Sequence, residues 1–275
     1  MSKFVSEPSF CYIAPTKYLE YTTRSSTHLV LAHLIMGGHD EYVEFYKSRA
    51  DVGDVIFCDN SAFELGASFD PNLLIEAAHK VGAKSLVLPD YPGQSSELTI
   101  RAAEEWIPKF QAAGLAPFFV PQGKKGDLQD WMVAYEWASR VAEIDIIGMS
   151  ILGIPNALPN VPAHMARVVM AELLNYSNTW GDKHHHWLGL NSPDEVEALL
   201  NMGVIDTLDS SSPIQYGIQG LVYTPHMNGW GVPKKAFVQH VDFNAPMHRG
   251  ARPIVEHNVA VVGGLFDEYN ENHTK

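Results

Sequence analysis

The chain has 275 residues, of which 46% are hydrophobic and 19% charged, and its 32 acidic and 19 basic side chains give a formal net charge of −13. This length suits one large α/β domain or two small ones. The negative charge argues for solubility and against a broad grip on nucleic acid, while leaving room for a small basic patch.

The N-terminal stretch bears on where the protein resides, and the cysteines bear on whether it binds a metal. Met1–Pro8 lacks the apolar core of a signal peptide, and no window approaches the ~20 apolar residues of a membrane span. The two cysteines, Cys11 and Cys58, lie far apart and form no CxxC pair, so neither a zinc knuckle nor a disulfide framework is indicated. We expect a cytoplasmic protein (in the infected host cell if it is viral) that meets no membrane and carries no metal or other cofactor.

Short apolar runs alternate with segments of helical spacing along most of the chain. Helices are expected to begin at Asp70, Ser95, Asp127 and Ser192, which are all good N-cap residues. Such alternation predicts an α/β fold with a parallel sheet, and seven repeats favour a (β/α)8 TIM-like barrel over an open sheet. The predicted strands are His28–Ile35, Asp54–Asp59, Ser85–Asp90, Ala116–Gln122, Asp145–Ser150, His186–Leu190 and Ile205–Asp209.

The C-terminal third is harder to assign. Phe237–Val241 and Val259–Val262 are both candidates for the eighth strand. Tyr223–Pro253 is rich in Gly, Pro, His and Asn, which predicts a long loop, an irregular C-terminal excursion near the site. No domain boundary is evident, so we expect a single domain over residues 1–275.

Four of the predicted strands end in a side chain suited to chemistry, namely Asp59, Asp90, Gln122 and Asp209. Parallel strands carry their ligand site at their C-terminal ends, so these four are expected to converge on one mouth. Any one aspartate could instead cap the following helix. Recurrence on four strands favours a shared site, in which the pKa values of neighbouring carboxylates separate into acid, base and nucleophile roles.

Five short motifs, in order between about Asp54 and Pro213, resemble those of the guanine transglycosylases. These enzymes are (β/α)8 barrels that exchange guanine for a 7-deazaguanine base. The segment Phe57–Phe63 is similar to the family's Thr-Asp-Ser-Gly-Gly-Phe/Tyr. The other four motifs are Val120-Pro121-Gln122-Gly123, Gly148-Met149-Ser150-Ile151-Leu152-Gly153, Leu188-Gly189-Leu190-Asn191-Ser192-Pro193 and Asp206-Thr207-Leu208-Asp209.

The resemblance implies a role for each matched residue. Asp209 falls on the nucleophile that attacks C1′ of the sugar, and Asp59 on the general acid/base. Asp90 falls on the residue that reads the guanine-like edge, because an ionised carboxylate accepts hydrogen bonds from N–H donors. Gln122 is expected to pair with the ring carbonyl, as are the backbone amides of Met149 and Ser150, with Ser61 close by. Phe63 and Leu188 are expected to sandwich the ring, unless they are only core residues.

Departures from the transfer-RNA members narrow the resemblance. Those enzymes carry a zinc site of three cysteines and a histidine after the nucleophile, and this chain has no such cysteines. Ser210-Ser211-Ser212-Pro213 follows Asp209, and Ala62 and Met149 stand where the family has glycines. The chain therefore resembles most the short zinc-free viral and phage branch, whose members insert 7-deazaguanine derivatives into DNA.

Two polar tracts leave alternatives open. The tract His184-His185-His186 could suggest a metal site. We expect the tract at the start of a strand, at the end opposite the site, where no further ligands converge. Lys124-Lys125 directly follows Gln122 and suits phosphate contact at the mouth, or else a solvated surface. Lys234-Lys235 and Arg249 with Arg252 are the other basic clusters.

The sequence thus predicts a DNA-guanine transglycosylase whose substrates are a flipped or single-stranded guanosine and a free 7-deazaguanine base. A zinc-free transfer-RNA enzyme is one alternative. A catalytically idle barrel that serves as a binding subunit is another. The charge of −13 favours the last, or a partner protein that supplies affinity for DNA.

Overall fold

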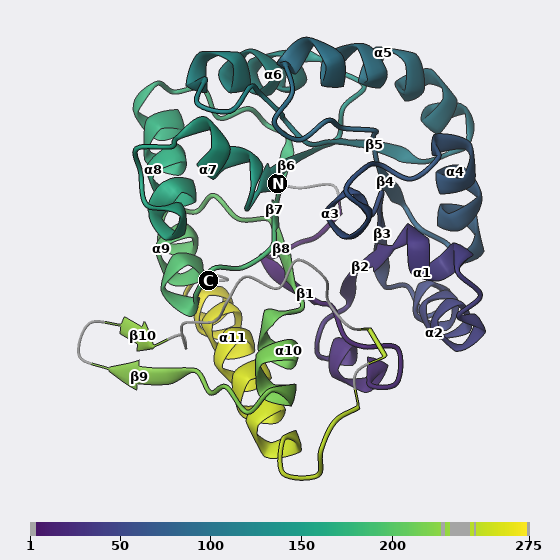
Figure 1. The fold of residues 1–275 in the computed structure, drawn as a ribbon, viewed down its shortest axis with the longest axis vertical. Coiled ribbons are helices and arrows are strands. Elements are labelled where there is room, and N and C mark those ends of the chain that lie inside the picture. The colour runs from purple at the N-terminus through teal and green to yellow at the C-terminus, as the bar shows by residue number, and fades with distance from the viewer. Residues whose placement is uncertain (1–3, 227–228, 232–242, 245, 274–275) are drawn as a thin grey trace.

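The computed structural model describes residues 4–226, 229–231, 243–244 and 246–273. Eight parallel strands form one sheet in the order β1-β8-β7-β6-β5-β4-β3-β2, surrounded by helices (Figure 1). The predicted (β/α)8 barrel is confirmed. The strands are β1 Ser9–Tyr12, β2 Thr27–Leu31, β3 Val55–Asp59, β4 Ser85–Val87, β5 Ala116–Phe119, β6 Ile146–Ser150, β7 His184–Leu188 and β8 Thr207–Ser210.

The eighth strand comes from the N-terminus, and the prediction of a C-terminal strand is wrong for Val259–Val262. Strand β1 pairs with β8 in parallel, which places Cys11 opposite Asp209. Val259–Val262 lies in helix α11, Arg252–His273. Its buried valines and phenylalanine recur every three or four residues, the period of a helix face. The other candidate, Phe237–Val241, lies outside the described residues.

The sheet nearly closes between its first and last strands. β1 and β2 stand side by side, and the Ser9 hydroxyl donates a hydrogen bond of 3.1 Å to Thr27 Oγ1 across this seam. At the N-terminal end of the barrel, the Phe4 ring meets Phe57 and His184 edge-on, at centroid distances of 5.6 and 5.5 Å.

The helices expected from the capping residues are confirmed. Asp70, Asp127 and Ser192 each accept a backbone N–H of the following helix through their side chains. The predicted strand His28–Ile35 ends early at Leu31, where a short helix begins. The helices are the 3₁₀ helix η1 Leu19–Arg24, α1 Ala32–Met36, α2 Asp40–Asp51, α3 Ala62–Leu65, α4 Pro71–Lys80, α5 Ser96–Ala112, α6 Leu128–Arg140, α7 Gly153–Ala157, α8 Ala163–Tyr176, α9 Pro193–Asn201, α10 Ser212–Ile218 and α11.

The described part of the segment after α10 includes a short element of regular structure. It contains a two-stranded hairpin, β9 Thr224–His226 with β10 Gly229–Gly231, before α11 begins. Residues 227–228, 232–242 and 245 of the predicted loop Tyr223–Pro253 lie outside the described residues. None of the helices in the described parts of the chain is both long and apolar enough to cross a membrane.

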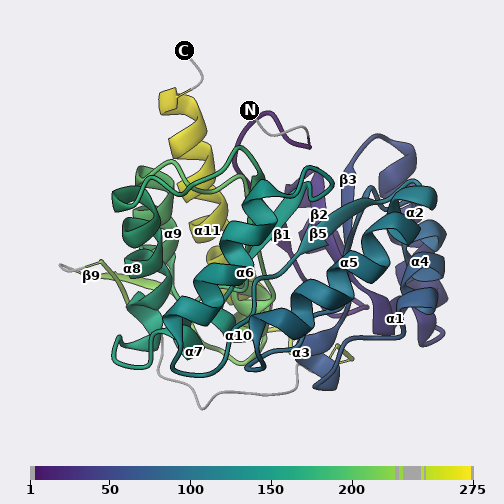
Figure 2. The same cartoon turned by 90° about the horizontal axis from the view of Figure 1, so that it is seen from above.

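Side chains alternate between the barrel interior and the helices along each strand. Phe57 and Phe118 meet inside, with ring centroids 6.4 Å apart, whereas Phe119 packs outward on Trp137 of α6 at 5.1 Å. Because Asp59 lies two residues beyond Phe57, it also faces inward, at the C-terminal end. Figure 2 shows the short helices α1, α3, α7 and α10 gathered at one end of the barrel, where the strands deliver these side chains.

Candidate active site

Asp209 lies inside strand β8 and is only 5% exposed. Its Oδ1 atom faces Nε2 of His186 at 3.0 Å and accepts the Gly189 backbone N–H at 3.2 Å. None of the described residues forms a hydrogen bond to its other oxygen, Oδ2. The carboxylate is therefore fixed on one side and unengaged on the other.

The expectation that the histidine tract lies at the far end of its strand is wrong for His186. Strand β7 begins at His184, two residues earlier than predicted, so His186 stands in the middle of the strand. Being two residues apart, His184 and His186 share the interior face, whereas His185 points outward to Tyr135 and Trp180. Sequence reasoning missed this contact because a two-residue error in a strand boundary moves a side chain along the barrel axis.

Asp59 is the last residue of β3, and its Oδ2 accepts the backbone N–H of Ser61 at 2.8 Å. Ser61 has a positive φ of 57°, which turns the chain sharply into α3. Burial raises the pKa of Asp59 well above its usual range, and the negative charges of Glu64, Asp209 and Asp90 raise it further. This environment favours the protonated acid.

Glu64 joins this group of acids, although sequence reasoning did not single it out. It lies on α3, and its Oε2 atom is buried without a hydrogen-bond partner among the described residues. Burial raises the pKa of Glu64 to about 7, and the charge of Asp209 contributes. The sequence did offer one indication: Glu64 follows Asp59 by five residues, and a short turn after a strand brings such a residue back over the strand end.

Asp90 is held by two amides. Its Oδ1 accepts Asn60 Nδ2 at 2.8 Å, and its Oδ2 accepts Gln122 Nε2 at 2.7 Å. Burial raises the pKa of the Asp90 carboxyl, against the lowering effect of these two hydrogen bonds. The N-cap position of the following helix is Ser95, five residues later, so Asp90 is not a helix cap.

Gln122 presents an acceptor to the mouth. Its amide nitrogen is engaged with Asp90, while its Oε1 is buried and has no hydrogen-bond partner in the described part of the chain. The side chain is only 2% exposed. A ring carbonyl, the partner expected from the sequence, needs a donor, whereas this oxygen suits an N–H group.

The remaining predicted residues surround the acids to different degrees. Phe63 on α3 is 39% exposed, which argues against a role as a core residue. Lys124 and Lys125 are both exposed in the loop after β5. Ser61 is buried, and its hydroxyl lies 2.9 Å from Nδ1 of His33.

At the end of β6, the expected contacts of the Met149 and Ser150 backbone amides stay a prediction, and the structure describes the side chains. The Met149 side chain is fully buried and, being next to the inward-facing Gly148, points toward the helices. A Cβ on Gly148 would lie 2.8 Å from Phe118 and 3.0 Å from Leu188, so this position needs glycine, and Leu188 packs into the barrel. The Ser150 hydroxyl accepts the backbone N–H groups of the turn that leads into α7.

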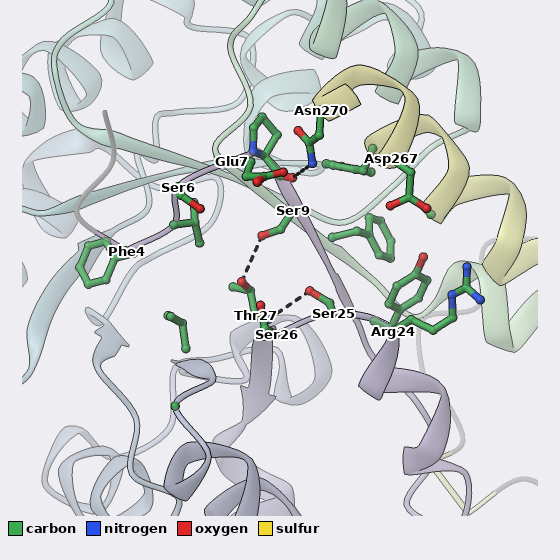
Figure 3. A pocket seen from close by; sticks show the side chains of 18 residues that line it. Phe4, Ser6, Glu7, Ser9, Arg24, Ser25, Ser26, Thr27, Asp267 and Asn270 are labelled. Carbon is green, nitrogen blue, oxygen red and sulfur yellow. Dashed lines mark hydrogen bonds between the residues drawn. The ribbon is translucent and has the colours of Figure 1, made fainter. Parts of the chain in front are cut away.

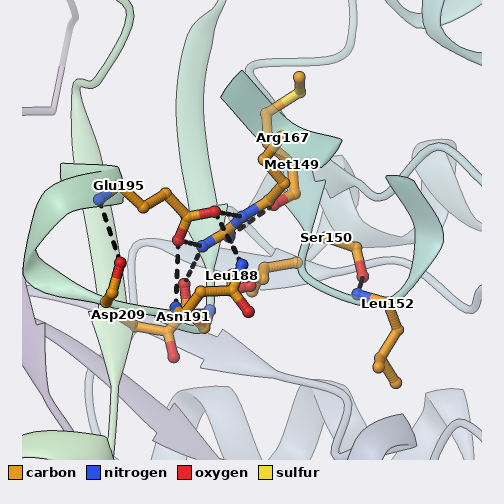
Figure 4. A network of polar contacts seen from close by, with 10 residues as sticks. Met149, Ser150, Leu152, Arg167, Leu188, Asn191, Glu195 and Asp209 are labelled. Carbon is orange, nitrogen blue, oxygen red and sulfur yellow. Dashed lines mark hydrogen bonds and ion pairs between the residues drawn. The ribbon is translucent and has the colours of Figure 1, made fainter. Parts of the chain in front are cut away.

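A buried ion pair holds the ends of β6 and β7 together (Figure 4). Arg167 of α8 is fully buried and donates to both carboxylate oxygens of Glu195 at the start of α9. Its remaining N–H groups reach the carbonyls of Met149, Leu188 and Gly189. The same turn provides the Gly189 N–H to Asp209, so this ion pair supports the backbone that contacts the Asp209 carboxylate.

The pocket in Figure 3 lies at the other end of the barrel. This cavity of about 360 Å³ is lined by the strand starts Ser9, Thr27 and Val55 and by Arg24 and Asp267. In such barrels the N-terminal face usually serves the stability of the fold, and the active site lies at the C-terminal face. The candidate site is therefore the group of acids at the C-terminal ends of the strands.

No metal centre is evident in the described residues, because no three His, Cys, Asp or Glu side chains are arranged to hold an ion. The expectation of a metal-free protein stays a prediction. No family model matches the chain, and no match is found among curated proteins.

Proposed function

We propose that this protein is a guanine transglycosylase that exchanges guanine in DNA for a 7-deazaguanine base. The observation that carries the proposal is the contrast between two carboxylates at one mouth. Asp209 lies beside His186 and accepts the Gly189 N–H on the same oxygen, whereas Asp59 is buried near other carboxylates that raise its pKa. Such a contrast suits a nucleophile and a general acid.

In the first half of the proposed reaction, Asp209 Oδ2 attacks C1′ of the deoxyribose. The bond from C1′ to guanine breaks, and Asp59 gives its proton to the departing base. In the second half, the incoming base gives a proton to Asp59 and its nitrogen attacks C1′, which releases Asp209. Carboxylates suit both steps because the transition state is positively charged, like an oxocarbenium ion.

The base would be read by acceptors. Asp90 and the Oε1 atom of Gln122 suit the N1–H and exocyclic amine of guanine, whereas adenine has a bare acceptor at N1. Phe63 and Leu188 would supply the stacking surfaces. A base within a duplex cannot enter such a mouth, so the substrate is a flipped or single-stranded nucleotide. Lys124 and Lys125 would contact phosphate, and a partner protein would supplement the affinity that a charge of −13 disfavours.

Exchange of labelled guanine tests the proposal. Wild-type protein is expected to exchange label with guanine in single-stranded DNA, while Asp209→Asn keeps the fold and loses exchange by several orders of magnitude. Asp182→Asn is the matched control, because Asp182 is exposed ahead of β7 at the opposite end of the barrel. Exchange only into transfer RNA would replace the proposed substrate, and exchange into neither would leave the idle barrel as the better account.

A further inference from the structure

Four side chains of β7 and β8 form an unbroken polar line inside the barrel. His184 Nε2 lies 2.6 Å from Thr207 Oγ1, and the same oxygen lies 2.7 Å from Nδ1 of His186. Nε2 of His186 then meets Asp209 Oδ1 at 3.0 Å. All four residues are buried, so bulk water does not compete for these contacts.

The shared Thr207 hydroxyl links the proton positions of the two histidine rings. A threonine hydroxyl has one proton to give, and here it faces two ring nitrogens. One ring must therefore donate to Thr207 and the other accept from it. A neutral imidazole carries one N–H, so a ring that accepts at Nδ1 carries its proton on Nε2.

Aromatic rings surround the line. The His186 ring lies edge-on to Phe57 and Phe118, at centroid distances of 5.8 and 5.3 Å. His184 lies against Phe57 and Phe4, and its pKa is lowered by burial and by the two neighbouring histidines. Burial against these rings disfavours an added charge on His184.

We propose that His186 is a positioning residue for Asp209, with its single ring proton on Nε2 and given to Asp209 Oδ1. Thr207 donates to Nδ1 of His186 and accepts from Nε2 of His184, which fixes this tautomer. The Gly189 N–H holds Oδ1 from a second direction, and Oδ2 is left for the reaction. The catalytic consequence rests on the proposed function, whereas the tautomer does not.

Three other titratable groups face the Asp209 carboxylate and affect its electrostatic environment. Cys11 stands opposite on β1, and burial together with the charge of Asp209 raises the pKa of its thiol. Asp59 and Glu64 approach from the side of β3 and α3. In the described part of the chain, only His186 Nε2 and the Gly189 N–H lie within hydrogen-bond distance of Oδ1, and a thiol is only a weak donor.

Nitrogen NMR of histidine-labelled protein tests the tautomer without any activity measurement. The His186 signal, assigned by its loss in His186→Gln, is expected to show a neutral ring with protonated Nε2 and bare Nδ1. Thr207→Val should turn this signal into a mixture of tautomers. An imidazolium at His186, or a proton on Nδ1 alone, would overturn the proposal.

Kinetics of Thr207 variants test the consequence. Thr207→Val is expected to lower kcat for base exchange by about 10²-fold, the scale of a misplaced reacting group, with KM for the base unchanged, and Thr207→Ser should restore it. The control is Thr22→Val, which removes a buried hydroxyl bonded to the Leu19 carbonyl away from the site. Unchanged kcat in a folded Thr207→Val would contradict the positioning role. If wild type exchanges no base at all, the proposed function fails, and NMR alone decides the inference.

Discussion

Glu64 illustrates how one side chain links burial to pH dependence. In the folded chain, burial raises its pKa to about 7, against about 4.3 for an unperturbed glutamate. Between these values the folded state binds more protons than the unfolded state, so the free energy of unfolding falls as pH rises. The stabilisation from this group is fully present below pH ~4 and is lost as pH rises through about 7.

Glu64→Gln is therefore expected to flatten the decline of the unfolding free energy over this pH range. Asp59 and Asp90 also make the unfolding free energy fall with rising pH, because burial raises their pKa values too. The informative quantity is therefore the difference in pH dependence between variant and wild type. Urea denaturation at a series of pH values measures it, with the exposed Glu104→Gln as control. Equal slopes in variant and wild type would show that Glu64 is not buried as described.

Among the elements, helices α8 and α9 do more than cover the sheet. Their side chains Arg167 and Glu195 meet 28 residues apart in sequence, where local patterns give no indication of pairing. Glu195 lies in the first turn of α9, where an acid is favoured by the helix dipole, a local feature. The capping residues were predictable for the same reason, because a cap depends on a few neighbouring residues.

Removing Arg167 alone should be costly. Arg167→Met leaves the Glu195 carboxylate buried without its cation, which typically costs about 3–5 kcal/mol. The double variant Arg167→Met with Glu195→Leu should regain part of this stability but not activity, since the carbonyls of Leu188 and Gly189 lose their donor. Urea denaturation of the three proteins checks this, and a double variant no more stable than Arg167→Met would show that the lone charge is not the cause.

For the whole molecule, the alternation of strands and helices was sufficient to predict the barrel but not its closure. Ser9–Tyr12 is short and has no helix pattern before it, and only long-range pairing with β8 makes it a strand. Val259–Val262 is an apolar run that fits a strand or a buried helix equally well. The convergence of Asp59, Asp90, Gln122 and Asp209 followed from strand direction alone, whereas the His186 contact depended on strand register.

The central claim is that Asp209 forms a covalent bond to the sugar, and mass spectrometry of the denatured protein tests this most directly. Protein mixed with a guanosine-containing DNA oligonucleotide without incoming base, then quenched in acid, should gain the mass of the oligonucleotide minus guanine. Fragmentation should place the added mass on Asp209, and Asp209→Asn should show none. An adduct on another residue, or exchange of labelled guanine with no adduct at any time point, would contradict the account.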